Sequence, residues 1–191
     1  MRFCVFCGSR SGIRPAYAAA AEELGRLLAQ NGIGLVYGGA SVGLMGSIAN
    51  AALDAGGEVI GVIPRDLVRR EVAHTALGDL RVVDTMHQRK ALMAELSDGF
   101  IALPGGVGTL DETFEIWTWA QLGHHNKPCA LLNVDGYFDK LNDFLDSIVA
   151  EGFLRPEHRA GLICQPTPQQ VLEAMRKHRP AQAVSKWQGR D

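Results

Sequence analysis

Residues 100 to 112 read Phe100-Ile101-Ala102-Leu103-Pro104-Gly105-Gly106-Val107-Gly108-Thr109-Leu110-Asp111-Glu112. The apolar residues predict a buried strand, the glycines a tight turn and the residues after them a helix. Because glycine lacks a Cβ, the backbone N–H groups of this turn can approach a ligand closely. A helix N-terminus adds partial positive charge and unpaired donors, so the stretch predicts a phosphate site with the carboxylate of Glu112 beside it.

The same alternation of apolar runs and helix-period segments continues on both sides of this stretch. It predicts an α/β fold, a single domain over residues 1–178 that forms a Rossmann-like doubly wound parallel sheet with helices on both faces. Residues 179–191 are expected to form a flexible tail. The expected strands are Phe3–Cys7, Gly34–Tyr37, Glu58–Ile63, Leu80–Val83, Gly99–Leu103, Cys129–Asn133 and, more weakly, Gly161–Cys164. The expected helices are Pro15–Gln30, Gly43–Ala55, Met86–Leu96, Leu110–Leu122, Tyr137–Glu151 and Pro168–Lys177.

Composition disfavours several classes of protein. A hydrophobic content of 47% and a charged content of 21% are typical of a globular domain. The net charge of -2 gives no support for nucleic acid or an anionic membrane as partner. No apolar run approaches the roughly 18 residues that span a bilayer, and no signal peptide is evident, so we expect a cytoplasmic protein.

Two sequence features look like metal sites, but we expect no metal. Cys4 and Cys7 have the spacing of half a zinc site. They lie in an expected strand, where positions three apart face opposite sides, and no second pair follows them. Buried structural cysteines are therefore favoured. The pair His124-His125 lacks the H-E-x-x-H context of a zinc enzyme.

Four turns are expected at the carboxyl edge of the sheet, where open α/β sheets bind ligands. Besides Pro104–Glu112 they are Gly8–Gly12, Gly38–Gly46 and Asp84–Lys90. None contains the P-loop motif G-x-x-x-x-G-K-[ST], which disfavours a P-loop triphosphatase. Asp111 stands where a G-x-G-x-x-G motif needs its last glycine, so a dinucleotide oxidoreductase is disfavoured as well.

The pair Arg89-Lys90 is the second clue to an anion. Thr85–Gln88 has the form of a capping box, which would start a helix at about residue 86. Cations near a first helical turn are disfavoured by a few tenths to about 1 kcal/mol, so a phosphate or a carboxylate should compensate them. The alternative is a solvated surface pair. The cluster Arg69-Arg70-Glu71 is equally compatible with a solvated loop and with a ligand contact.

The role of Glu112 stays open at this point. Thr109–Glu112 is itself a possible capping box, in which the Glu112 side chain would accept the Thr109 N–H. From the residues alone, this structural role and a catalytic role are equally supported. The apolar stripe of Phe114, Trp117 and Leu122 is expected to pack in a core or a subunit interface.

Taken together, these motifs resemble the "lonely guy" family, the cytokinin riboside 5′-monophosphate phosphoribohydrolases. The family motif P-G-G-x-G-T-x-x-E is complete in Pro104–Glu112, and its partner, Met-x-x-Arg-Lys, is Met86–Lys90. The resemblance spans roughly residues 3 to 165. Its further matches are Cys7–Ser9, Gly38–Gly39, Gly43–Gly46, Thr118–Gly123, Lys127–Pro128 and Leu132–Tyr137.

The resemblance implies a homodimeric hydrolase that needs no cofactor. Its substrate would be a nucleoside 5′-monophosphate, an adenosine 5′-monophosphate with or without an N6 substituent, and its products a free base (cytokinin or adenine) and ribose 5-phosphate. It implies Arg89 and Glu112 as the catalytic pair. The substrate-binding residues expected from the resemblance and the edge turns are Gly8, Ser9, Gly39, Gly43, Met45, Glu71, Arg89, Lys90, Gly105, Gly106, Val107, Gly108, Thr109, Leu110, Glu112 and Thr118.

In the expected mechanism, ionised Glu112 stabilises the positive charge of the departing sugar, holds its hydroxyls or orients water. Arg89 is expected to position Glu112 and to lower its pKa. The alternative function is a non-hydrolytic carrier of a nucleotide or molybdenum cofactor on the same fold, against which the Arg89–Glu112 combination argues. Lysine decarboxylase, another label given to this family, is rejected because nothing in the sequence indicates a pyridoxal-phosphate site.

Overall fold

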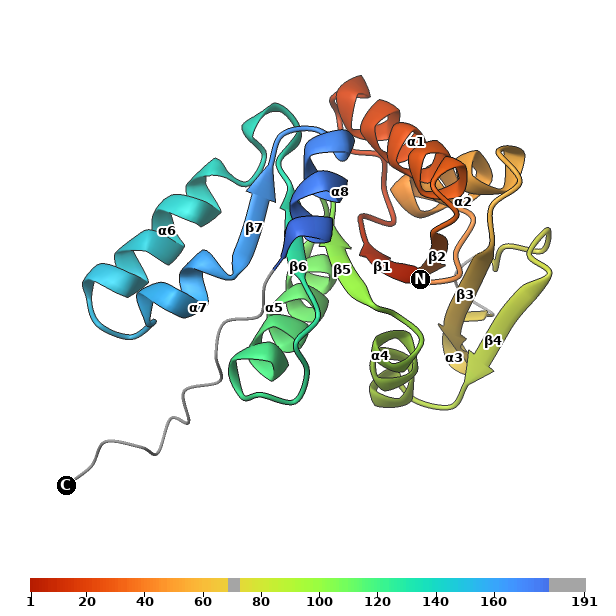
Figure 1. Ribbon diagram of the computed structural model, residues 1–191. Coiled ribbons are helices and arrows are strands. Elements are labelled where there is room, and N and C mark those ends of the chain that lie inside the picture. Colours follow the sequence, from red (N-terminus) through yellow and green to blue (C-terminus); the bar gives the residue numbers. More distant parts are fainter. Residues whose placement is uncertain (69–72, 179–191) are drawn as a thin grey trace.

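A computed structural model describes residues 1–68 and 73–178 of the chain, and its core is one seven-stranded sheet (Figure 1). All neighbouring strands are parallel, in the order β4-β3-β2-β1-β5-β6-β7. Helices cover both faces, so the predicted doubly wound α/β fold is confirmed. The strands, each within one residue of its predicted limits, are β1 (Arg2–Phe6), β2 (Gly34–Tyr37), β3 (Val59–Pro64), β4 (Asp79–Val83), β5 (Gly99–Ala102), β6 (Cys129–Leu132) and β7 (Leu162–Gln165).

The strand order reverses between β1 and β5, which creates a crevice at the carboxyl edge of the sheet. Val5 of β1 is in register with Tyr37 on one side and Ile101 on the other. Beyond the strand ends, the N–H of Gly8 donates to the carbonyl oxygen of Pro104 at 3.1 Å. The turns that follow β1 and β5 therefore lie side by side at the crevice.

The helices form two layers because each buries one apolar face against the sheet. On the first face, Leu24 and Ile48 join Val5 in one core cluster. On the second face, Met93 and Ile116 pack in another. The first layer consists of α1 (Pro15–Gln30), α2 (Gly43–Asp54) and α8 (Pro168–Lys177), and the second of α4 (Met86–Glu95), α5 (Val107–Gln121) and α6 (Asp139–Ala150). Short helices that were not predicted are α3 (Arg65–Val68), η1 (Val134–Gly136) and α7 (Pro156–Ala160).

The start of α5 differs from the prediction. The helix begins at Val107 with Gly106 as its N-cap, rather than at Leu110. The glycines allow the chain to turn directly from the strand into the helix, so Thr109 lies inside the first turn and is buried. The Thr109–Glu112 capping box is therefore wrong, and a helix cap no longer explains Glu112. The other predicted box is confirmed, because the Thr85 side chain accepts the Gln88 N–H at the start of α4.

The start of α6 is also later than predicted, at Asp139 instead of Tyr137. Two residues just before it have positive φ angles, Asp135 at 49° and Gly136 at 70°. This left-handed backbone cannot continue a right-handed helix. The result is a compact turn between β6 and α6 that faces the crevice from the side of β6.

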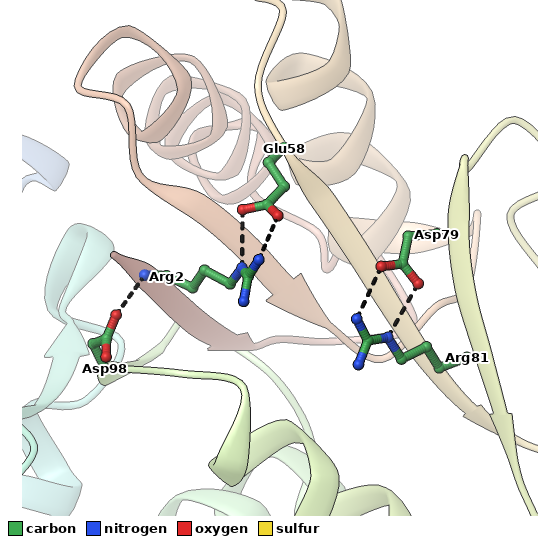
Figure 2. A network of polar contacts seen from close by, with 5 residues as sticks. All are labelled: Arg2, Glu58, Asp79, Arg81 and Asp98. Carbon is green, nitrogen blue, oxygen red and sulfur yellow. Dashed lines mark hydrogen bonds and ion pairs between the residues drawn. The ribbon is translucent and has the colours of Figure 1, made fainter.

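At the amino edge of the sheet, opposite the crevice, charged side chains pair with one another (Figure 2). Arg2 donates to both carboxylate oxygens of Glu58, at 2.9 and 2.7 Å, and its backbone N–H donates to Asp98 at 2.8 Å. Arg81 donates to both oxygens of Asp79 at 3.1 Å. Exposed pairs of this kind contribute little to stability. Both arginines of this edge are thus paired with a carboxylate, whereas the predicted ligand-binding turns lie at the carboxyl edge.

The four cysteines are free thiols. Cys4 and Cys7 are buried in different core clusters, on opposite faces of the sheet, as the strand pattern predicts. Within residues 1–68 and 73–178, no group of three or more His, Cys, Asp or Glu side chains is placed to hold a metal ion. In the same part of the chain, no helix is long and apolar enough to cross a bilayer. The expected tail, residues 179–191, lies outside the described residues.

Candidate active site

A cavity of about 300 Å³ opens at the carboxyl edge, where the predicted turns meet. Its wall is formed by the end of β1, the turns after β1, β2 and β5, the first residues of α5 and one side chain of α2, and the charged side chains come from α4 and α5. The lining residues are Val5, Phe6, Cys7, Gly8, Ser9, Gly38, Met45, Arg89, Gly106, Val107, Gly108, Thr109 and Glu112. The structure therefore brings together both predicted catalytic residues and seven of the other predicted substrate contacts: Gly8, Ser9, Met45, Gly106, Val107, Gly108 and Thr109.

Arg89 and Glu112 form a nearly buried ion pair across this cavity. Arg89 Nη2 lies 3.4 Å from Glu112 Oε1, and the two side chains are 10% and 12% exposed. The guanidinium is held from behind, because Nε donates to the carbonyl oxygen of Val62 at 3.2 Å. The anion that compensates Arg89 is thus a carboxylate presented by the neighbouring helix. Both groups are oriented before any ligand arrives.

The pKa of Glu112 is raised overall, although Arg89 lowers it as predicted. Burial raises the pKa of this carboxyl above its ordinary value, and the nearby carboxylates of Asp111 and Glu115 add to the rise. Arg89 and Lys90 oppose the rise with their positive charges but do not reverse it. The predicted lowering effect of Arg89 is therefore confirmed, but removal of the carboxyl from water outweighs it. A carboxyl with a raised pKa is a better proton acceptor than an exposed glutamate, which suits general base chemistry near neutral pH.

Lys90 turns away from Arg89 and binds α5 instead. Its Nζ lies 2.7 Å from Asp111 Oδ2 and 3.0 Å from Glu115 Oε2. Burial by itself lowers the pKa of Lys90, but the hydrogen bonds and charges of the two carboxylates raise it overall. The predicted compensation by carboxylates thus holds for both cations. Lys90 does not line the cavity, so its contact with substrate stays a prediction.

The turn before α5 is packed so closely that only glycine fits at its centre. A Cβ on Gly105 would lie 2.1 Å from Thr109 Oγ1 and 2.9 Å from the Gly8 nitrogen. The tight turn places the start of α5 in the cavity wall, where the first N–H groups of a helix lack intrahelical partners. These donors and the helix dipole make the cavity attractive to a phosphate.

The remaining predicted contacts lie at the margins of the site. Gly43 lets the turns after β1 and β2 meet, because a Cβ there would lie 2.3 Å from the Ser9 backbone. A Cβ on Gly39 would face Ile63 and Leu80 instead. Elsewhere, Leu110 packs against the second core cluster, Thr118 is exposed on α5 outside the cavity, and Gly105 lines an adjoining cavity of about 360 Å³. Glu71 falls outside the described residues.

Sequence reasoning missed Gly38 as a functional residue. A Cβ at this position would lie 2.3 Å from Arg89 Nη2 and 2.9 Å from Met45 Sδ. Gly38 therefore makes room for the guanidinium in its paired position. The glycine pair after β2 was a visible signal, but the sequence does not show that one of the two faces an arginine so far along the chain. Val5, Phe6 and Cys7, at the end of β1, were missed because they carry no motif chemistry.

Comparisons with known proteins agree with this arrangement. A family model described as "Possible lysine decarboxylase" matches residues 45–175. The chain is 50% identical over 179 residues to the cytokinin riboside 5′-monophosphate phosphoribohydrolase LOG3 of Arabidopsis thaliana, which covers 94% of this chain and 83% of the relative. It is 49% identical over 183 residues to the phosphoribohydrolase LOG of Oryza sativa subsp. japonica, over 96% of this chain and 76% of the relative.

Solved structures share the architecture at lower sequence identity. A molybdenum cofactor carrier protein from Chlamydomonas reinhardtii superposes with a TM-score of 0.71 at 22% identity, over 92% of this chain and 96% of that protein. At that identity the likeness shows a common fold and carries no information about the ligand.

Proposed function

The chain belongs to the family of the cytokinin riboside 5′-monophosphate phosphoribohydrolases, and from this premise we propose that it hydrolyses the N-glycosidic bond of adenosine 5′-monophosphates, with or without an N6 substituent. The products are the free base and ribose 5-phosphate. The observation that carries the proposal is the buried Arg89–Glu112 pair in one cavity with the N-terminus of α5. A site for a nucleoside monophosphate needs both parts, because the helix N-terminus can bind the phosphate and the ion pair can act on the sugar.

The N-terminus of α5 binds the 5′-phosphate in this proposal. The N–H groups at the start of the helix, on Gly106 to Thr109, supply donors, and the helix dipole supplies partial positive charge. The Glu112 side chain projects into the same cavity from the next turn of the helix. A phosphate held at the helix start therefore places the ribose of the same molecule beside Glu112, and such positioning removes much of the entropic barrier to reaction.

Glu112 acts on the sugar as the bond breaks. The C1′–N bond cleaves with its electron pair going to the base, and the ribose gains oxocarbenium character. The ionised carboxylate of Glu112 stabilises that charge and accepts a proton from the water that adds to C1′. The base leaves as its neutral form after taking up a proton. Arg89 holds the carboxylate in place, and its positive charge favours the ionised form against the effect of burial.

Two other functions have weaker support. A carrier on this fold would not require a buried carboxyl with a raised pKa in contact with the sugar. A pyridoxal-phosphate decarboxylase needs a lysine whose pKa is lowered, so that its neutral amine can form a Schiff base. Lys90, which follows Arg89 on α4, has a raised pKa and is bound to two carboxylates. These observations favour hydrolysis over both alternatives.

The experiment that separates hydrolase from carrier is an incubation of the purified protein with AMP, isopentenyl-AMP, GMP and CMP, followed by chromatography. We expect free adenine from AMP, or the free N6-substituted base from isopentenyl-AMP. Nucleotides that bind but remain intact in all four incubations would support the carrier and contradict the hydrolase. The relative rates of the four reactions also show which base is preferred.

We propose further that the enzyme is a homodimer of the cytoplasm. The two helices that carry the catalytic pair expose apolar side chains, Leu122 at 50% and Met86 at 42%. A hollow of about 480 Å³ between these helices is lined partly by Ala91, Ala94 and Trp119, which suits a second copy of the same face. The free thiols suit a reducing compartment. Sedimentation equilibrium should give twice the chain mass, and a monomer at micromolar concentration would contradict the dimer.

A further inference from the structure

A tyrosine outside the predicted site contacts the phosphate-binding turn. The hydroxyl of Tyr137, in the turn between β6 and α6, donates to the carbonyl oxygen of Gly105 at 2.5 Å. Tyr137 lies in the wall of the adjoining cavity, which shares Gly8, Ser9 and Gly106 with the cavity of Arg89 and Glu112. It therefore contacts the turn from this adjoining cavity.

This hydrogen bond determines which way the next peptide group points. A peptide unit is planar and trans, so its C=O and N–H point in opposite directions. With the Gly105 carbonyl directed toward Tyr137, the N–H of Gly106 points away from the Tyr137 hydroxyl, and Gly106 is also part of the catalytic cavity wall. The preceding carbonyl, of Pro104, is likewise occupied, because it accepts the Gly8 N–H at 3.1 Å. Both carbonyls of the turn are thus engaged, which leaves N–H groups for an anion.

The turn needs such a restraint because it cannot contain a stiffer residue. Gly105 and Gly106 flank the peptide, and glycine adopts both signs of φ at little cost. A rotated peptide would direct a carbonyl oxygen at the phosphate and remove one donor. Packing excludes any side chain at Gly105, where a Cβ would lie 2.1 Å from Thr109 Oγ1. A hydrogen bond from outside the turn supplies the rigidity that the turn itself lacks.

Tyr137 is itself firmly held. Its ring meets the Tyr17 ring edge-on at a centroid distance of 5.5 Å. Arg14 Nη1 donates to the carbonyl oxygen of Asp135 at 3.1 Å, and the Asn133 side chain accepts the Phe138 N–H at 2.7 Å. The turn between β6 and α6 is therefore a fixed support from which the hydroxyl reaches Gly105.

We propose that Tyr137 is a positioning residue for the 5′-phosphate, which locks the Gly105–Gly106 peptide with its N–H toward the ligand. The inference rests on the proposed function and adds a residue from a third strand–helix turn to the site. Removing the Tyr137 hydroxyl should weaken the binding of ligands that carry a 5′-phosphate. It should change the affinity for the same ligands without the phosphate very little.

The test replaces Tyr137 with phenylalanine, which removes one oxygen atom and keeps the ring. In a Glu112→Gln background that prevents turnover, isothermal titration should show AMP binding about tenfold more weakly. A loss of this size is expected when one backbone N–H no longer donates to the charged phosphate. Adenosine binding should stay within about twofold. Tyr37→Phe is the matched control, because it removes the same atom from a tyrosine that lines neither cavity and whose hydroxyl has no hydrogen-bond partner among the described residues, and it should change neither affinity.

Other outcomes would overturn the inference. An unchanged affinity for AMP in Tyr137→Phe would show that the hydrogen bond does not orient the phosphate site. Equal losses for AMP and adenosine would show a merely structural role, and thermal melting of each variant would show whether the fold had weakened. Failure of the wild-type protein to release base would instead contradict the proposed function and leave the AMP-to-adenosine comparison intact as a separate result.

Discussion

Replacing Glu112 with glutamine is expected to lower kcat for base release by about 10³-fold while the protein remains folded. Glutamine has the same shape and can still accept a hydrogen bond from Arg89, so the geometry of the cavity is kept. It carries no negative charge and is a poor proton acceptor, so neither the oxocarbenium charge nor the attacking water is assisted. The measurement is steady-state turnover of AMP with thermal melting of the same preparation.

The control for this variant is Glu173→Gln. Glu173 lies on α8, away from the cavity, in a weak exposed pair with Lys177 at 3.9 Å. The same chemical change there should alter kcat by less than about twofold, since surface pairs of this kind contribute little. Retained turnover in folded Glu112→Gln protein would remove Glu112 from the mechanism and leave the buried pair with a structural role.

Replacing Arg89 with methionine should be the second largest change, with kcat/KM lower by about 10²-fold and stability lower by about 3 kcal/mol. The apolar side chain leaves the Glu112 carboxyl buried without its cation and without its orienting partner. Chemical denaturation and AMP turnover measure the two effects. An Arg89→Met variant with the kcat/KM of the wild-type protein would show that catalysis does not need the Arg89–Glu112 pair.

The same variant makes a prediction about pH, because Arg89 opposes the rise in the pKa of Glu112 caused by burial. The ionised carboxylate is the active form, so activity should increase as the pH rises through the folded-state pKa of Glu112. That increase lies at higher pH than for an exposed glutamate, whose pKa is about 4.3. Without Arg89 the pKa rises further, so the acidic limb of the profile should move to still higher pH. A limb that stays in place would show that another group controls it.

The pH dependence of stability has the opposite sign to the pH dependence of activity. Because burial raises the folded-state pKa of Glu112 above its unfolded value, the folded protein binds the proton more tightly. The contribution of this group is full below the unfolded pKa and is lost as the pH rises through the folded one. At the pH values where Glu112 is ionised and active, its burial therefore lowers the stability of the folded protein.

Gly38→Ala reaches the same guanidinium from its other side. The added methyl would lie 2.3 Å from Arg89 Nη2, so the arginine must move away from its paired position. We expect kcat/KM to fall in the same direction as in Arg89→Met, by about tenfold. Gly78→Ala is the matched control, because a Cβ there meets no atom within 4 Å.

The fold was largely predictable from the sequence, and the contacts of the site only in part. Buried parallel strands appear as continuous apolar runs, which is why the limits of β1 to β7 were found within one residue. The start of α5 was misplaced because Thr109–Glu112 imitates a capping box, and the tight glycine turn that overrides it depends on tertiary packing. Local sequence patterns predict the helices and strands, but they do not predict how one turn packs against another.

The electrostatics of the site depend on contacts between α4 and α5 that no local pattern reveals. The sequence showed that Arg89 and Lys90 need an anion, but Glu112 takes one cation while Asp111 and Glu115 take the other. The sign of the pKa shift of Glu112 followed from its burial, which spacing along the chain does not report. The roles of Gly38 and Tyr137 likewise arise from neighbours that are distant in sequence.

The proposed reaction breaks one specific bond, the glycosidic bond, and leaves the phosphate attached to the sugar. Phosphorus NMR of an AMP incubation, with chromatography of the same sample, measures this directly. We expect ribose 5-phosphate and adenine in equal amounts, with both absent from the Glu112→Gln incubation. Inorganic phosphate with adenosine, or AMP that stays intact while bound, would contradict the proposed reaction.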